Sequence, residues 1–214
     1  MAITLIPSSK QQTQYIVLES VTWETYQALL KDLGDHRASR LAYDQEILEI
    51  VMPSELHEII NRLLALLVTT LTDELNMKIK NYGSTTLDRE DLARGVEPDS
   101  CFYIKQVDNI LGRRKLNIKT DPPPDLAIEV NITSSSRRRF SIYLELKIPE
   151  VWHYTKQRGV LIYQLKGSEY IECEFSPTFT MVSGAILMQF LQMAETEDDN
   201  GVIRALRQWL RNQI

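Results

Sequence analysis

Apolar residues recur at helical spacing in one long segment that begins after Pro53-Ser54. Positions three and four residues apart lie on one face of a helix, so this segment is predicted to be an amphipathic helix packed on a sheet. The apolar stripe consists of Leu56, Ile59, Ile60, Leu63, Leu64, Leu67, Leu71 and Leu75. A shorter helix is predicted over residues 22–31, because Thr22 can cap its start and Gly34 ends it.

Shorter apolar runs predict strands and further helices. Residues 40–43 and 47–52 flank Asp44-Gln45-Glu46 and indicate a hairpin. The other predicted strands are residues 78–82, 84–87, 98–104, 125–132, 151–156 and 160–165. The other predicted helices are residues 137–146, 186–193 and 202–210, and residues 105–124 read as a loop. This mixture favours an α/β or α+β fold.

The segment at residues 125–132 is the clearest predicted strand, and it places acidic side chains among apolar ones. Alternation puts Asp125, Ala127, Glu129 and Asn131 on one face and four apolar side chains on the other. Buried carboxylates need a cation or several hydrogen-bond donors, so either this edge is wet or a metal ion binds there. The strand around residues 98–104 carries Asp99. If the two strands pair, Asp99 and Glu129 can converge on one Mg²⁺ or Mn²⁺ ion.

Structural roles remain open for several of these residues. Asp99 and Asp125 each follow a proline, where Asp commonly stabilises a turn. His57-Glu58 is more typical of a helix terminus than of a ligand pair. The sequence contains no Gly-rich phosphate loop, no G-x-S-x-G and no H-E-x-x-H motif, so no other constellation competes with the acids.

Charge is distributed unevenly along the chain. The formal net charge is -5, yet residues 105–158 contain eleven Lys or Arg and six Asp or Glu. A basic middle indicates an anionic ligand, although an ordinary solvated surface is the alternative. Two cysteines, Cys101 and Cys173, suit reduced thiols better than a disulfide framework. With no signal peptide or membrane span recognised in the sequence, we expect a cytoplasmic protein without a membrane partner.

Three segments combine these features: RLAYDQEILEIVMPSELHEIINRLL, GVEPDSCFYI and PPPDLAIEVNITSSSRRRFSIYLELKIPEVWHY. In the last, an acidic strand, a Ser/Thr turn, a basic helix start and a P-E-x-W strand entry follow in order. From about residue 22 to residue 165 the chain resembles the Uma-type restriction endonuclease-like family, a branch of the PD-(D/E)XK nuclease superfamily. The resemblance implies a restriction-endonuclease-like core, with a central mixed β-sheet flanked by helices.

The resemblance also implies roles for individual residues. Asp99 and Glu129 correspond to the two metal-binding acids of the superfamily motif. Asn131 stands where that motif has a lysine, and it carries no charge to offset a negative phosphorane. The family often has a basic residue on the following helix, and Arg139 is the matching position here. An arginine can hold a phosphate but stays protonated, so the metal would have to activate the water.

Further candidates complete this hypothetical site. The backbone carbonyl of Val130 would add a metal ligand, and Glu58 would contribute through a water molecule. Candidate substrate-binding residues are Asp125, Arg137 and Arg138. Arg137 and Arg138 are also alternatives to Arg139 as the basic residue that replaces the motif lysine.

The expected activity is Mg²⁺- or Mn²⁺-dependent endonucleolytic hydrolysis of DNA, with the phosphate backbone as partner and a homodimer as the expected assembly. The alternatives are a catalytically silent DNA-binding or assembly domain that keeps the fold, and a hydrolase of a small phosphate ester. We expect an N-terminal extension at residues 1–21 and one nuclease-like domain at residues 22–214. Its core would span about 40–165, with a C-terminal helical elaboration at about 184–212 that packs on the core or forms a dimer surface.

Overall fold

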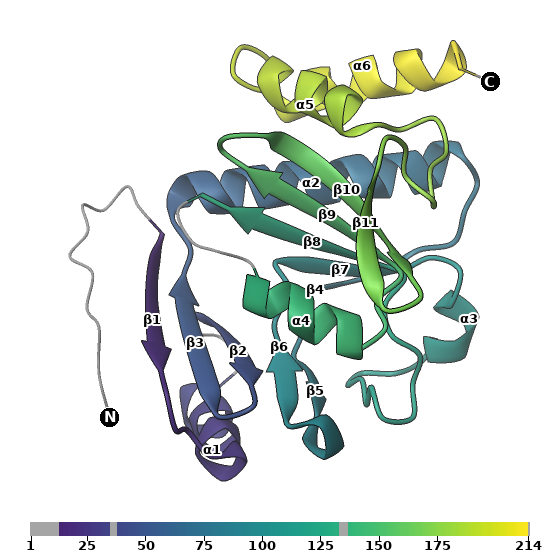
Figure 1. Ribbon diagram of the computed structural model, residues 1–214. Coiled ribbons are helices and arrows are strands. Elements are labelled where there is room, and N and C mark those ends of the chain that lie inside the picture. The colour runs from purple at the N-terminus through teal and green to yellow at the C-terminus, as the bar shows by residue number, and fades with distance from the viewer. Residues whose placement is uncertain (1–12, 35–37, 133–136, 214) are drawn as a thin grey trace.

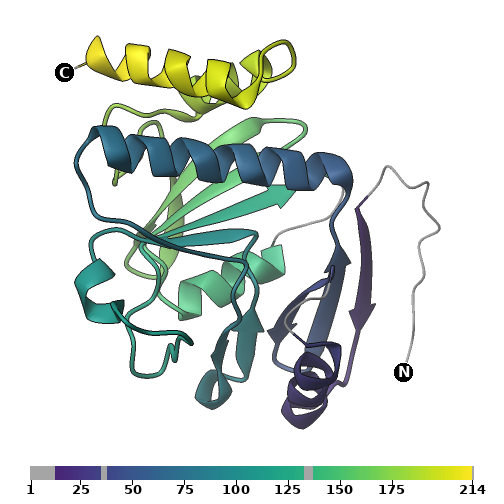
Figure 2. The ribbon, with the colours of Figure 1, turned by 180° about the vertical axis from the view of Figure 1, so that it is seen from behind.

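The computed structural model describes residues 13–34, 38–132 and 137–213, which form two β-sheets with helices around them (Figure 1). Helix α2 (Glu55–Glu74) covers one face of the larger sheet, and α4 (Arg137–Glu145) lies on the opposite face, as the views from the two sides agree (Figure 2). This arrangement confirms the predicted mixed sheet flanked by helices.

The smaller sheet is five-stranded and antiparallel. In spatial order its strands are β1 (Gln14–Leu18), β3 (Ile47–Met52), β2 (Arg40–Asp44), β6 (Arg94–Val96) and β5 (Leu87–Arg89). The predicted hairpin is present, and its turn residues Gln45 and Glu46 adopt φ values of 46° and 72°. Helix α1 (Trp23–Leu33) is capped by Thr22, whose side chain accepts a hydrogen bond from Thr25 N at 3.2 Å.

The larger sheet is six-stranded and mixed. Its strands, in spatial order, are β11 (Glu169–Cys173), β10 (Gly159–Lys166), β9 (Glu150–Thr155), β8 (Leu126–Asn131), β7 (Ser100–Tyr103) and β4 (Lys80–Gly83). Only β8 and β9 run parallel within the described sheet, and α4 makes the connection between them. Both faces of β8 are buried, as its near-continuous apolar sequence requires.

Helix α2 is rotated relative to the predicted apolar stripe. Leu56 and Ile59 are 49% and 54% exposed, whereas His57 and Asn61 are buried. Asn61 explains this rotation, because its amide donates to the carbonyl of Asp99 at 3.1 Å and so ties the helix to the start of β7. The first turn of α2 therefore presents polar side chains to the sheet, and the apolar stripe begins one turn later.

The C-terminal helices pack on the core. Helices α5 (Gly184–Met193) and α6 (Asp199–Arg211) lie over α2, away from the small sheet (Figure 1). Buried apolar residues of both helices belong to the same core as α2 and β8: Leu187, Phe190, Val202, Leu206 and Leu210. Of the two roles expected for this segment, core packing is therefore confirmed.

Several predicted boundaries were wrong. The predicted loop contains α3 (Val107–Ile110), and residues 84–87 hold only the first residue of β5. Strands β4 and β5 belong to different sheets. Strand β11 was missed, and the predicted N-terminal extension contributes β1 as an edge strand. In the described part of the chain, no helix has both the length and the apolar character needed to cross a membrane.

Candidate active site

Asp99 and Glu129 come together where β7 begins and β8 ends. Strand pairing sets Ser100 opposite Ile128, and one further step in the same antiparallel register places Asp99 beside Glu129. The backbone N–H of Val130 donates to Asp99 Oδ2 at 2.7 Å, which fixes this carboxylate against β8. Both acids are buried, at 3% and 4% exposure. The pairing expected from the sequence is thus present.

Asp99 is surrounded by positive and hydrogen-bonding groups. His57 Nε2 lies 2.8 Å from Asp99 Oδ1, and Arg40 Nε lies 3.2 Å from the same oxygen. Burial by itself raises the pKa of Asp99, but His57 and the charges of Arg40 and Arg139 outweigh it and hold the pKa below its usual value. His57 lies in the first turn of α2, as its interpretation as a helix-terminus residue predicts, and from there it also contacts Asp99.

Glu129 has a weaker set of partners. Tyr143 donates a hydrogen bond to Glu129 Oε2 at 2.6 Å, and Arg139 Nε lies 3.4 Å from Oε1. Burial raises the pKa of Glu129 to about 7, and the nearby charge of Asp99 adds to this, against the opposing effect of Arg139. The two acids thus differ in protonation near neutral pH: Asp99 is held ionised, and Glu129 binds a proton readily.

Arg139 is buried between the two sheets. Its Nε donates to Glu49 Oε1 on β3 at 3.1 Å, and its Nη1 donates to the carbonyl of Glu97 at 3.0 Å. Burial disfavours the charged guanidinium, but Glu129, Glu49 and Asp99 more than compensate and raise its pKa. Arg139 thus lies beside Glu129 as expected, while its hydrogen bonds go to other partners.

Two further acids contact the arginines of the site. Glu49 Oε2 lies 3.6 Å from Arg138, in addition to the hydrogen bond from Arg139 described above. Glu58 accepts a 2.7 Å hydrogen bond from Arg40. Glu49 was overlooked in the sequence, although it is a charged residue within an apolar strand, the same signal that pointed to Glu129.

The family profile described as "Putative restriction endonuclease" (Uma2) matches residues 23–194. The chain belongs to the Uma2 family. The structure also resembles the crystal structure of a putative nuclease of the DUF820 group from Anabaena variabilis ATCC 29413, with a TM-score of 0.52 and 15% sequence identity. That match covers 74% of this chain and 94% of the other and supports the fold. No curated protein matches the chain.

The other predicted site residues of this Uma2 chain lie at different distances from the two acids. Asn131 is buried at the end of β8, on the Glu129 face. Asp125 lies at the opposite end, where its Oδ2 accepts hydrogen bonds from three backbone N–H groups, those of residues 104–106. Four residues of strand separate Asp125 from Glu129 by about 13 Å. Arg137 is exposed at the start of α4.

The Uma2 family implies a divalent metal, and the site fits one in its chemistry. The carboxylate oxygens of Asp99 and Glu129 are ligands of the kind that Mg²⁺ and Mn²⁺ prefer. The negative charge of Asp99 disfavours the ionisation of Glu129, and a bound cation would offset this repulsion. Within residues 13–34, 38–132 and 137–213, no three His, Cys, Asp or Glu side chains converge closely enough to hold an ion. Asp99 and Glu129 would therefore need carbonyl and water ligands to complete the coordination shell.

The basic middle of the chain is divided between two places. Arg113, Arg114 and Lys115 are exposed on the connection from β7 to β8. Because β7 and β8 are antiparallel, this connection lies at the strand ends opposite Asp99 and Asn131. The arginines at the start of α4 lie near the acids, and the exposed turn with Lys156 and Arg158 follows Thr155, which pairs with Asn131 at the same edge of the sheet.

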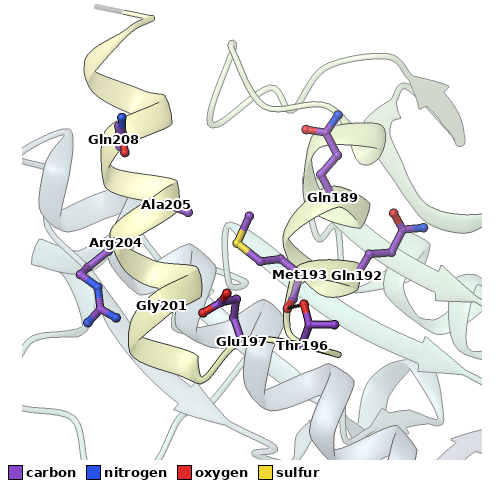
Figure 3. Close-up of a pocket in the computed structure, with 9 residues that line it drawn as sticks. All are labelled: Gln189, Gln192, Met193, Thr196, Glu197, Gly201, Arg204, Ala205 and Gln208. Carbon is purple, nitrogen blue, oxygen red and sulfur yellow. Dashed lines mark hydrogen bonds between the residues drawn. The ribbon is translucent and has the colours of Figure 1, made fainter.

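A separate open groove of about 740 Å³ lies between α5 and α6 (Figure 3). Its lining residues are Gln189, Gln192, Met193, Thr196, Glu197, Gly201, Arg204, Ala205 and Gln208. None of the predicted site residues lines this groove, so its size says nothing about the chemistry at β7 and β8.

Proposed function

We propose that this protein is a metal-dependent endonuclease that hydrolyses phosphodiester bonds in DNA. The observation that carries the proposal is the placement of Asp99 beside Glu129 at one end of β7 and β8, with Arg139 3.4 Å from Glu129. Membership in a family described as "Putative restriction endonuclease" supports the same interpretation. DNA as the substrate and Mg²⁺ or Mn²⁺ as the metal are part of the proposal.

In this proposal Asp99 and Glu129 hold the cation, together with the carbonyl of Val130. A bound divalent ion supplies a water of lowered pKa and a contact to a phosphate oxygen. Arg139 stays protonated and cannot accept a proton from water, so its contribution is positive charge beside the acids. Asn131 offers an amide on the same face but no charge. Arg138, 29% exposed at its side chain, is better placed to reach a phosphate from solvent.

The test is cleavage of supercoiled plasmid and duplex oligonucleotides with Mg²⁺ or Mn²⁺ by wild type and Glu129→Gln. We expect the variant to lose at least 100-fold in rate, the scale seen when a group that stabilises the transition state is removed. Glu172→Gln is the matched control, because Glu172 is an exposed acid on β11 whose ion pair is with Arg158 in the turn between β9 and β10. Equal activity of wild type and Glu129→Gln would contradict the assignment.

A catalytically silent DNA-binding or assembly domain is the second candidate. It is favoured by the network itself, because both oxygens of Asp99 and both oxygens of Glu129 already lie within 3.4 Å of protein nitrogen or hydroxyl groups. Thermal unfolding with millimolar Mn²⁺ separates the two candidates, since a ligand of the native state raises the melting temperature. An unchanged melting temperature together with DNA binding would favour the silent domain.

The same proposal includes a homodimer, because two copies would present one site to each strand of a duplex. Light scattering after gel filtration tests this expectation. A cytoplasmic location is also part of the proposal. Cys101 and Cys173 are both free thiols, as expected in a reducing compartment.

A further inference from the structure

Arg40 is shared between two carboxylates at the start of α2. Its Nη2 donates a 2.7 Å hydrogen bond to Glu58, whereas its Nε lies 3.2 Å from Asp99 Oδ1 and makes no hydrogen bond among the residues that the structure describes. Both the shorter distance and the hydrogen-bond geometry therefore make Glu58 the stronger partner of Arg40. Arg40 is held mainly by the acid that lies farther from Glu129, and its attraction to Asp99 is a charge contact.

The same arrangement recurs on the other side of the site. Arg139 Nε donates its hydrogen bond to Glu49 at 3.1 Å, and Glu129 Oε1 lies farther away at 3.4 Å. Each acid expected to bind metal thus has an arginine beside it, and each arginine has a second acid that holds it more closely. We call Asp99 and Glu129 the inner acids and Glu58 and Glu49 the outer acids.

We propose that the outer acids are positioning residues that keep the inner acids available to a divalent cation. This inference rests on the proposed function. An arginine with a single carboxylate partner forms a strong charge-assisted pair that a metal ion has to break. An arginine with two carboxylate partners stays paired with the outer acid when the inner acid binds a metal ion, so its buried charge is not left unpaired. Without its outer acid, each arginine would close on its inner acid and compete with the metal.

A simpler explanation would be that the outer acids attract cations only through their negative charge. The two explanations differ in one respect. If attraction at a distance were the cause, the effects of removing Glu58 and removing Arg40 would add. If Glu58 acts through Arg40, removing Glu58 has no effect once Arg40 is gone. A double-mutant cycle separates them.

The experiment measures Mn²⁺ affinity of the full chain by titration calorimetry at fixed ionic strength. The variants are Glu58→Gln, Arg40→Gln and the double variant, with Glu55→Gln as the matched control. Glu55 lies in the same first turn of α2, carries the same charge and is exposed. The side chain of Glu58 is 31% exposed, so its replacement leaves the packed core intact.

We expect Glu58→Gln to weaken Mn²⁺ binding by roughly tenfold, the size of a partly buried charge contact, and Glu55→Gln by less than about twofold. In the Arg40→Gln background the Glu58 substitution should change the affinity by less than about twofold. Glu49→Gln, Arg139→Gln and their double variant provide the same cycle for the arginine beside Glu129.

Equal effects of Glu58→Gln and Glu55→Gln, or additive effects in the cycle, would overturn this inference and leave the proposed function standing. If wild type binds no Mn²⁺, the proposed metal-dependent function fails, and this inference fails with it. Should Glu49→Gln not fold, the Arg40 cycle decides the question alone.

Discussion

Tyr143, in the last turn of α4, donates a 2.6 Å hydrogen bond to Oε2 of Glu129 at the centre of the candidate site. Both side chains are buried, and burial together with the charge of Glu129 raises the pKa of Tyr143 well above its usual value. Tyr143 therefore stays protonated and acts as a permanent donor. Helix α4, which follows β8 in the chain, thus fixes the side chain of Glu129 through Tyr143.

Tyr143→Phe should lower the free energy of unfolding by about 1–3 kcal/mol, because it leaves a buried carboxylate oxygen without its donor. The loss should be larger at pH 8, where Glu129 is more ionised, than at pH 5.5. Urea denaturation at both pH values measures it. Tyr170→Phe is the control, since Tyr170 donates to the carbonyl of Ile148 at 2.7 Å and loses a neutral partner. A loss from Tyr143→Phe that is independent of pH would contradict this role.

The raised pKa of Glu129 predicts how stability changes with pH. Its pKa is about 7 in the folded protein, above the ordinary value of 4.5, so between these values the folded state binds more protons than the unfolded state. Stability from this group is therefore present below pH 4.5 and is lost as the pH rises through 7. Glu129→Gln removes the penalty, so its stability relative to wild type should rise by about 3 kcal/mol between pH 4.5 and pH 8.

Chemical denaturation of wild type and Glu129→Gln across this range, in the presence of a metal chelator, checks the prediction. The difference between the two proteins matters here, because all other titrating groups are common to both. A difference that stays constant from pH 4.5 to pH 8 would show that Glu129 titrates as an ordinary carboxyl group.

Local sequence signals predicted much of the fold. Three elements were predicted from such signals: the start of α1 from its cap at Thr22, the hairpin at residues 40–52 from its turn, and the strand around Glu129 from its period of two. Strand β11 also had a signal, the Gly167-Ser168 pair between two alternating runs, which was not recognised. Strand β1 pairs only at the edge of a sheet, and its short apolar run has no turn beside it to mark a hairpin.

The partners within the site could not be predicted in the same way. Arg139 and Glu49 are 90 residues apart in sequence, and their contact depends on how α4 packs between the two sheets. The acids themselves were predictable, because a charge within an apolar strand is costly unless it has a partner. Tertiary packing decides which arginine pairs with which acid, and no local sequence pattern predicts that pairing.

The rotation of α2 leads to a prediction that apolar periodicity alone would get wrong. Leu56 and Leu64 both belong to the predicted stripe, yet Leu56 is 49% exposed and Leu64 is fully buried. Leu64→Ala should cost about 2–5 kcal/mol of stability, and Leu56→Ala less than about 1 kcal/mol. Urea denaturation measures both, and each substitution serves as the control for the other. Equal losses would mean that the first turn of α2 packs on the sheet after all.

The division of the basic segment predicts which arginines contact DNA. Under the proposed function, phosphates lie near the inner acids, so Arg138 is within their reach while Arg114 and Lys115 are at the other end of β7 and β8. Each lost phosphate contact reduces the dependence of log affinity on log salt by about one unit. Arg138→Gln should therefore reduce this slope, and the double variant Arg114→Gln/Lys115→Gln should leave it unchanged. Fluorescence anisotropy with a labelled duplex over a range of salt concentrations measures both slopes. The opposite ranking would place the nucleic acid over the connection from β7 to β8, far from the carboxylates, and would separate DNA binding from the candidate active site.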